Sequence, residues 1–184
     1  LTTAVSILIF NQNQQSSYRT INRSFNVIRE SIESNRKKLI NDAEYAASAG
    51  DMGTQIQFLS EEKSSDNTIL TESSFKDIAS SLYTIMQAGN ILKMVVYDME
   101  GDITAFSMTD DHQAVVGYPN RNQNQTGFIA AELPLGTKLA NASWDNLADV
   151  PDIEATFDKS TLPDRPQVEF IVKNKFLIIN AMAP

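Results

Sequence analysis

The sequence of 184 residues predicts an α+β fold, in which a long N-terminal helix and a second helix pack on an antiparallel sheet. Apolar residues recur at helical spacing through the first half of the chain. Two later segments, 94–106 and 168–182, are rich in β-branched and aromatic residues on either side of a short turn. A hydrophobic content of 42% suffices for one well-packed core, so one domain is the default.

The first ten residues, LTTAVSILIF, are mostly apolar but too few to span a bilayer. The chain stops soon after the strand-like segment FLIINAMA. We therefore expect an excised piece of a longer protein, with residues 1–15 as the membrane-proximal end of a truncated transmembrane helix and 16–184 as one domain. The alternative is that the first ten residues form a helix or strand that packs on the core.

Residues 17–49 are predicted to form a long helix with apolar side chains in heptad order. At 1.5 Å per residue this helix would extend about 50 Å, farther than a compact domain of this size can cover. We therefore expect one part to pack on the domain and another on a second copy, with Asn35 fixing the register. The alternative is that the stripe faces the domain's own second helix. The predicted dimer seam is Tyr18, Ile21, Phe25, Ile28, Ile32 and Leu39.

The α/β core is expected over 71–184, after a short helix at about 54–63. Ser74 and Asp77 resemble a capping box, which would begin another helix that ends at Ala88-Gly89-Asn90. Gly101 can take the positive φ of the turn in the 94–106 hairpin. A short strand at 114–117, a strand at 128–133 and a helical turn capped by Ser143 should follow. We expect the last hairpin to join the sheet.

The composition narrows the class of protein. A net charge of −8 argues against nucleic acid as a partner, and the absence of cysteine removes thiolate catalysis and zinc ribbons. His112 is the sole histidine, in a polar loop, so no nucleophile and base can be paired and we expect no enzyme and no cofactor. The acidic residues Asp98, Glu100 and Asp102 lack the full ligand pattern of a calcium loop, so solvated turns are favoured over a metal site.

The turn Val95-Val96-Tyr97-Asp98 with Gly101, the ending Ile178 to Pro184, and the order of elements resemble the Cache family of extracytoplasmic sensor domains. The resemblance covers about residues 16–184. It implies a PAS-like antiparallel sheet behind the long helix. It also implies a place between two transmembrane helices of bacterial chemoreceptors (methyl-accepting chemotaxis proteins), histidine kinases or cyclic-dinucleotide enzymes. The amino-acid-binding signature of some members is not recognisable, so no ligand class is implied.

In such a sheet one face carries the long helix and the other cups a small ligand. The purely apolar set Leu92, Met94 and Val96 should face the helix. Val96 and Ile178 should be buried. Tyr97, Tyr118, Arg121 and Trp144 are the candidate ligand-binding residues, and Arg121 could hold a carboxylate through two parallel hydrogen bonds. Each of these four has the alternative of a structural or solvent-facing role.

The expected function is a periplasmic ligand-sensing domain of a transmembrane chemoreceptor in the bacterial inner membrane. We expect it to bind a small molecule such as an organic acid or amino acid and to form a homodimer. The same module on a histidine kinase or diguanylate cyclase is one alternative. A non-signalling structural envelope protein is the other.

Overall fold

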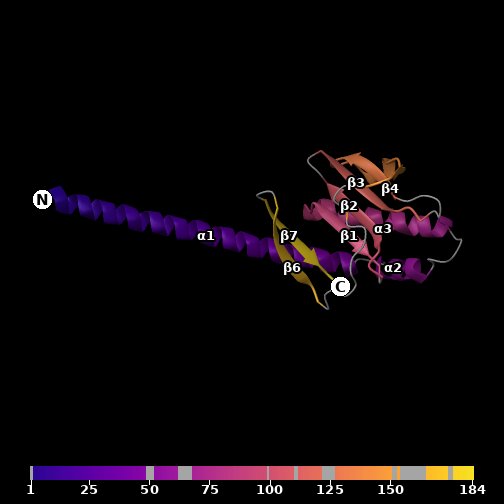
Figure 1. The fold of residues 1–184 in the computed structure, drawn as a ribbon, viewed down its shortest axis with the longest axis horizontal. Coiled ribbons are helices and arrows are strands. Elements are labelled where there is room, and N and C mark those ends of the chain that lie inside the picture. The colour runs from indigo at the N-terminus through magenta and orange to yellow at the C-terminus, as the bar shows by residue number, and fades with distance from the viewer. Residues whose placement is uncertain are drawn as a thin grey trace. The chain divides into compact units, whose positions relative to one another are not determined.

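The computed structural model describes residues 2–48, 52–61, 68–98, 100–109, 112–121, 127–150, 153, 165–173 and 176–184. The fold is α+β, as predicted (Figure 1). Backbone contacts divide the chain into two compact units, which are described separately. Residues 1–41 and 167–182 form the helix–hairpin unit, and residues 42–166 and 183–184 form the α/β unit.

Helix α1 spans Thr2–Ser48 and begins well before the predicted range of 17–49. Its sequence contains neither glycine nor proline, the two residues that most destabilise a helix interior. The hydroxyls of Thr20 and Ser24 are also compatible with the helix, since each donates to the carbonyl four residues earlier. Residues 2–15 are therefore helical and continuous with the predicted heptad segment. The predicted stop at Gly50 lies outside the described residues.

Helices α2 (Met52–Glu61) and α3 (Thr68–Gly89) belong to the α/β unit. The predicted capping role of Ser74 is wrong, because Ser74 lies inside α3. No helix breaker precedes it, and Lys76 pairs with Glu72 one turn earlier, so the helix begins several residues upstream. The predicted end is confirmed: Asn90 takes the left-handed conformation at φ 55°, and the Ile91 amide donates to the Met86 carbonyl.

The main sheet is an antiparallel meander in the order β1-β2-β3-β4-β5. Its strands are β1 (Lys93–Tyr97), β2 (Ile103–Thr109), β3 (Gln113–Pro119), β4 (Phe128–Pro134) and β5 (Asp145–Leu147). The first hairpin is confirmed, with Gly101 at φ 90° and a bulge between Val96 and Tyr97 that leaves Thr104 as the extra residue.

Two local predictions about this sheet need correction. The strand predicted at 114–117 is longer, because β3 pairs with β4 along its whole length. The helical turn predicted after Ser143 is wrong: residues Asp145–Leu147 form β5, which pairs with the start of β4. A 3₁₀ turn lies instead at Leu139–Asn141. Pairing with a neighbouring strand outweighs local propensity in so short a segment.

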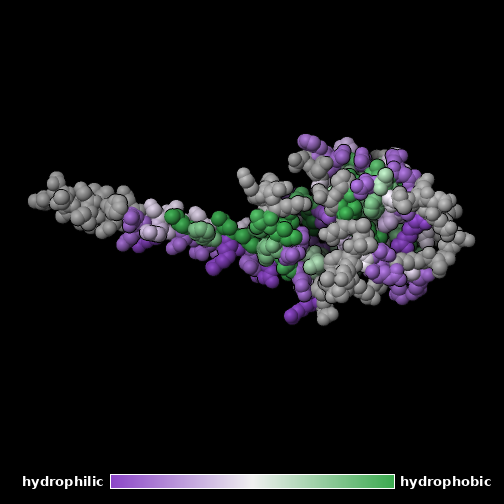
Figure 2. Space-filling view, viewed as in Figure 1, coloured by the Kyte–Doolittle hydropathy of each residue, from purple (hydrophilic) through white to green (hydrophobic). Residues whose placement is uncertain are grey.

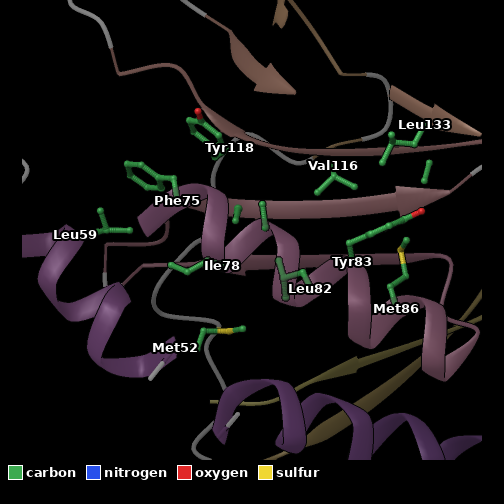
Figure 3. Packing of buried hydrophobic residues seen from close by; sticks show 13 residues of the cluster. Met52, Leu59, Phe75, Ile78, Leu82, Tyr83, Met86, Val116, Tyr118 and Leu133 are labelled. Atoms are coloured by element: carbon green, nitrogen blue, oxygen red, sulfur yellow. The ribbon is translucent and has the colours of Figure 1, made fainter. Parts of the chain in front are cut away.

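The main core lies between α3 and one face of the sheet (Figure 3). Phe75, Ile78, Leu82 and Met86 recur at helical spacing, so one face of α3 points toward the strands. Val116, Tyr118 and Leu133 meet them from β3 and β4, and Met52 and Leu59 of α2 close one side. Met94 and Val96 pack against this cluster, as predicted. The same expectation for Leu92 is wrong, because this residue precedes β1 and is 74% exposed. The described helices of this core are α3 and α2 rather than the long helix.

The opposite face of the sheet carries a second apolar cluster. Ile103, Phe106, Ala130 and Val150 are its buried members. Gly117 makes this packing possible, because a Cβ there would lie 2.7 Å from Cζ of Phe106. This face is therefore closed in part by protein side chains, which leaves less of it for the ligand surface that the resemblance implies.

The last hairpin is confirmed as β6 (Gln167–Lys173) paired with β7 (Phe176–Met182). It forms a two-stranded sheet of its own within the helix–hairpin unit. The expected burial of Ile178 is wrong, because 38% of this residue is exposed. The reason is topological: among the described residues, neither strand pairs with any of β1 to β5. Val96 is partly buried, so that expectation is met only in part.

Candidate functional site

Three aromatic rings meet where the start of α3 approaches the end of β3. Phe75 stacks on Tyr118 with ring centroids 5.5 Å apart and an interplanar angle of 6°. Trp144, from the segment before β5, lies 5.6 Å from Tyr118 in a tilted arrangement. Each separation falls in the favourable range for aromatic pairs. We call Phe75, Tyr118 and Trp144 the aromatic cluster.

Charged side chains surround the aromatic cluster. Lys76 Nζ donates to Glu72 Oε1 at 2.8 Å and lies 5.6 Å from the centroid of Trp144. The Tyr118 hydroxyl donates to the same Glu72 oxygen at 3.3 Å. Arg121 places its guanidinium carbon 5.0 Å from the centroid of Phe75. Cations at these distances are attracted to the negative faces of the rings.

These contacts shift the pKa values of two side chains in this region, Glu72 and Tyr118. The hydrogen bond from Lys76 is the main reason that the pKa of Glu72 is lowered, so Glu72 is ionised at neutral pH. Burial raises the pKa of Tyr118 well above its usual range, and the Glu72 carboxylate raises it further. Tyr118 therefore stays a neutral hydrogen-bond donor and is unsuited to act as a base near neutral pH.

The turn between β1 and β2 is organised by Asp98, which is 5% exposed. Its Oδ1 accepts the backbone N–H groups of Glu100 at 2.9 Å and Asp102 at 3.0 Å. An aspartate that accepts amides two and four residues onward stabilises a tight turn, and Gly101 supplies the required positive φ. Arg121 Nη2 approaches the other oxygen, Oδ2, at 3.8 Å. The sequence motif YDMEGD thus places the Asp98 carboxylate next to the Arg121 guanidinium.

An open hollow of about 660 Å³ lies beside this turn. Glu100 and Asp102 come from the turn and Arg121 from the end of β3, so the hollow presents charges of both signs. Its apolar lining includes Ile103, Pro119 and Phe128. Gly127 also lines the hollow and has φ 122°. A Cβ at this position would clash with the Leu147 carbonyl, so the chain requires glycine just before β4. We call this feature the charged hollow.

Carboxylate oxygens of Asp98, Glu100 and Asp102 lie within 4.8 Å of one another. Such oxygens suit hard cations such as Ca²⁺, which takes about six to eight oxygen ligands. Three carboxylates, one of which already accepts two backbone amides, supply fewer ligands than that. The arrangement agrees with the sequence interpretation, in which a solvated acidic turn is favoured over a metal site.

The structure brings together three of the four predicted ligand-binding residues. Tyr118 and Trp144 are neighbours in the aromatic cluster, and Arg121 reaches that cluster through Phe75. Tyr97 does not join them, because it packs against the cluster on the opposite face of the sheet. The bulge in β2 pairs Tyr97 with Ile103 on that face. A ligand-binding role for the four residues stays a prediction.

Sequence reasoning missed the contribution of α3 to this region. Glu72 and Lys76 were not singled out, although their spacing of four residues is that of a helical ion pair. Glu100 and Asp102 were noted only as turn residues, since their proximity to Arg121 depends on the antiparallel pairing of β2 with β3.

Much of the predicted seam on α1 is exposed, as Figure 2 shows for the apolar residues along this helix. Tyr18 is 65% exposed and Phe25 is 66% exposed, with Ile21 and Ile28 at half or more. Ile32 and Leu39 are partly buried, and Ala46, seven residues later on the same stripe, is buried. The stripe therefore passes from exposed to buried along a single helix.

The chain was compared with known proteins at three levels. No family model, no curated protein and no solved structure matches it. Among the described residues, none of the helices is both long and apolar enough to cross a membrane.

Proposed function

We propose that this chain is a periplasmic ligand-sensing domain of a transmembrane chemoreceptor of the bacterial inner membrane. It would bind a small molecule in the α/β unit and transmit a change along α1. No catalytic step is part of the proposal. The Cache resemblance motivates this assignment, and the geometry described above is compatible with it.

One observation carries the proposal: α1 combines an exposed apolar seam with a segment that belongs to the α/β unit. Apolar residues at positions 18, 21, 25 and 28 alternate in steps of three and four, which is the spacing of a two-helix coiled coil. The same stripe continues in steps of seven residues through Ile32 and Leu39 to Ala46, which is buried. A helix of this kind suits a receptor in which association and ligand binding must be coupled.

A parallel arrangement of two copies fits the charges beside the seam. With Tyr18 at heptad position a, Arg29 and Arg36 occupy position e, while Ser24 and Ser31 occupy position g. Parallel helices bring g against e of the partner, so serine meets arginine. Antiparallel helices bring e against e, so arginines would repel one another. We therefore propose a parallel homodimer through Tyr18 to Leu39.

The dimer seam can be tested by a pair of charge substitutions. Phe25→Glu combined with Ile32→Glu should give a folded monomer, because like charges within a seam repel and are costly to desolvate. The matched control is Val27→Glu, since Val27 is 64% exposed but lies off the stripe. Sedimentation equilibrium measures the mass. A wild-type chain that stays monomeric at several hundred micromolar contradicts the seam, as does a dimeric double variant.

Cysteine cross-linking tests the direction of the helices, because the chain contains no cysteine of its own. Ile28→Cys should form a disulfide between copies under mild oxidation, since position d meets itself across a parallel seam in register. Val27→Cys, on the opposite side of the helix, is the control and should cross-link much less. Equal cross-linking of the two variants would exclude the parallel seam.

Two alternatives keep a specific observation in their favour. The same geometry suits a sensor module on a histidine kinase or diguanylate cyclase, because these proteins would differ from a chemoreceptor in the output domain and not in the α/β unit. A structural envelope protein would use the exposed stripe for assembly alone. Ligand binding by the α/β unit separates the sensor from the envelope protein, because only the sensor requires it.

A further inference from the structure

One edge of β6 is unpaired among the residues that the structure describes. The sheet of β6 and β7 has two strands, so each strand has a neighbour on one side only (Figure 1). On its other side an edge strand presents a row of N–H and C=O groups, which can pair with a strand of another chain. Residues 167–172 form no hydrogen bond to any described residue outside this hairpin. The edge of β6 can therefore accept a further strand.

The sequence of β6, QVEFIVK, complements itself when two copies run antiparallel. A pairing centred on Ile171 sets Glu169 of each copy opposite Lys173 of the other. The same register sets Phe170 opposite Val172. Opposite charges across an antiparallel pair stabilise it, and so do pairs of an aromatic with a β-branched residue. We infer that β6 pairs with β6 of a second copy in this register, so that two hairpins form one four-stranded sheet.

The surroundings of β6 allow this pairing. Glu169 is exposed and forms no ion pair with another residue that the structure describes. Phe170 is 46% exposed and Val172 is 76% exposed. The register of β6 with β7 is unbroken along the whole strand, so no bulge turns the edge away. A second strand can therefore pair without breaking any hydrogen bond or ion pair between described residues.

The other outer strands of the two described sheets suit such a pairing less well. β7 contains no charged residue, and a pairing centred on Ile179 would set Ile178 opposite Asn180. β5 has three residues, and β1 has a register shift between Val96 and Tyr97. Short strands and bulges protect sheet edges from other chains. Because both of the complementary charges come from β6 itself, charge complementarity favours a second copy of this chain over an unrelated strand.

This surface is distinct from the predicted seam on α1, and the inference does not rest on the proposed function. One strand edge buries far less than the roughly 1,200 Å² of a stable complex, so single chains are expected to pair weakly, at millimolar concentrations. The monomer expected for Phe25→Glu with Ile32→Glu at several hundred micromolar is therefore unchanged. A seam dimer would carry two β6 edges, so the same contact would join dimers into larger assemblies.

A cysteine at the centre of the register can capture so weak a contact. Ile171→Cys would lie opposite its own copy, at a Cα separation of about 4.5 to 5.5 Å, within the range of a disulfide. The chain has no cysteine of its own. Ile178→Cys is the matched control, because Ile178 is the β7 partner of Ile171 within one hairpin. All chains also carry Phe25→Glu and Ile32→Glu, which remove the seam. Under mild oxidation, Ile171→Cys should form the covalent dimer at least about tenfold faster than Ile178→Cys.

Charge reversal tests the register. In the Ile171→Cys chain, Glu169→Lys or Lys173→Glu alone places like charges opposite each other at both ends of the pair. Each is expected to slow cross-linking about five- to tenfold. The two changes together restore opposite charges and should restore the rate. An equal mixture of the two single variants should favour mixed disulfide dimers, because lysine of one chain then meets glutamate of the other at both ends. Ion-exchange chromatography separates the products by charge.

Other results would overturn the inference. Equal or faster cross-linking of Ile178→Cys excludes pairing through β6. Rates that do not respond to charge reversal, or a statistical distribution of products from the mixture, exclude the register centred on Ile171. Absence of disulfide dimers from every variant at several hundred micromolar excludes the contact. All chains share the same substitutions in α1, so the comparison does not depend on whether the seam forms, which sedimentation equilibrium measures separately.

Discussion

The packing of α3 on the sheet can be tested by comparing two isoleucines with opposite surroundings. Ile78 of α3 is completely buried at 0% exposure, whereas Ile178 of β7 is 38% exposed. Both can be changed to alanine, which removes the same three carbon atoms. We expect Ile78→Ala to lower the free energy of unfolding much more than Ile178→Ala.

The expected magnitudes follow from burial. At about 0.8 kcal/mol per buried methylene, loss of three carbons from Ile78 costs about 2.4 kcal/mol in transfer free energy alone. The residual cavity adds to this, so a total of about 3 to 4 kcal/mol is expected. Ile178 loses only part of the transfer term and leaves no closed cavity, so about 1 kcal/mol is expected.

Urea unfolding followed by far-UV circular dichroism measures both variants, and tryptophan fluorescence measures the α/β unit by itself. Trp144 is the sole tryptophan and lies against Tyr118 in the α/β unit, so it reports the unfolding of that unit. With a slope of about 2 kcal/mol per molar urea, a loss of 3 kcal/mol shifts the midpoint by about 1.5 M. A loss below about 1 kcal/mol for Ile78→Ala, or equal shifts for the two variants, would refute this account of the core.

Two further predictions concern the sheet and its pH dependence. Gly117→Ala should destabilise the protein by about 1 to 3 kcal/mol, because a new Cβ would lie 2.7 Å from Cζ of Phe106, and an unchanged urea midpoint would contradict this packing. The pKa of Tyr118 is raised on folding, so its contribution is fully present below the ordinary value of 10.0 and is lost as the pH rises above it. Wild type should therefore lose stability in alkali more steeply than Tyr118→Phe, and parallel curves of unfolding free energy against pH would exclude a buried phenol at this position.

The elements that the sequence predicts best are those in which local and tertiary preferences agree. The 94–106 hairpin combines β-branched residues with Gly101, whose positive φ the turn requires, and the structure has it as expected. The end of α3 at Gly89 and Asn90 is similarly determined by local chemistry. Where only local propensity was available, as at Ser143, pairing of β5 with β4 gave a different result.

The candidate site was less predictable because its parts meet through tertiary packing. Tyr118, Arg121 and Trp144 were chosen for lying in one loop-rich region, and the β3–β4 and β4–β5 pairings do bring them close together. Strand alternation separates Tyr97 from Met94 and Val96, but it does not say what covers each side of β1. Both faces of the sheet carry apolar clusters, so an exposed ligand face could not be read from strand alternation alone.

Burial of Ile178 failed as a prediction for a related reason. An apolar, strand-like sequence predicts that a segment pairs in some sheet but does not say which one. The hairpin of β6 and β7 pairs internally, and residues such as Phe170, Val172 and Leu177 remain exposed. Apolar character and burial in the main core are therefore separate properties in this chain.

Arg121 connects the charged hollow to the aromatic cluster within the α/β unit. Its guanidinium lines the hollow, approaches Asp98 at 3.8 Å and lies over Phe75, which in turn stacks on Tyr118. A ligand anion that takes hydrogen bonds from Arg121 competes with its contact to Asp98 and so shifts the guanidinium relative to the Phe75 ring. A ligand acts on the protein only through such differences in contact between two arrangements. Because Trp144 lies next to Tyr118, its fluorescence should change when a carboxylate ligand binds to wild type but not when the same ligand is added to Arg121→Gln.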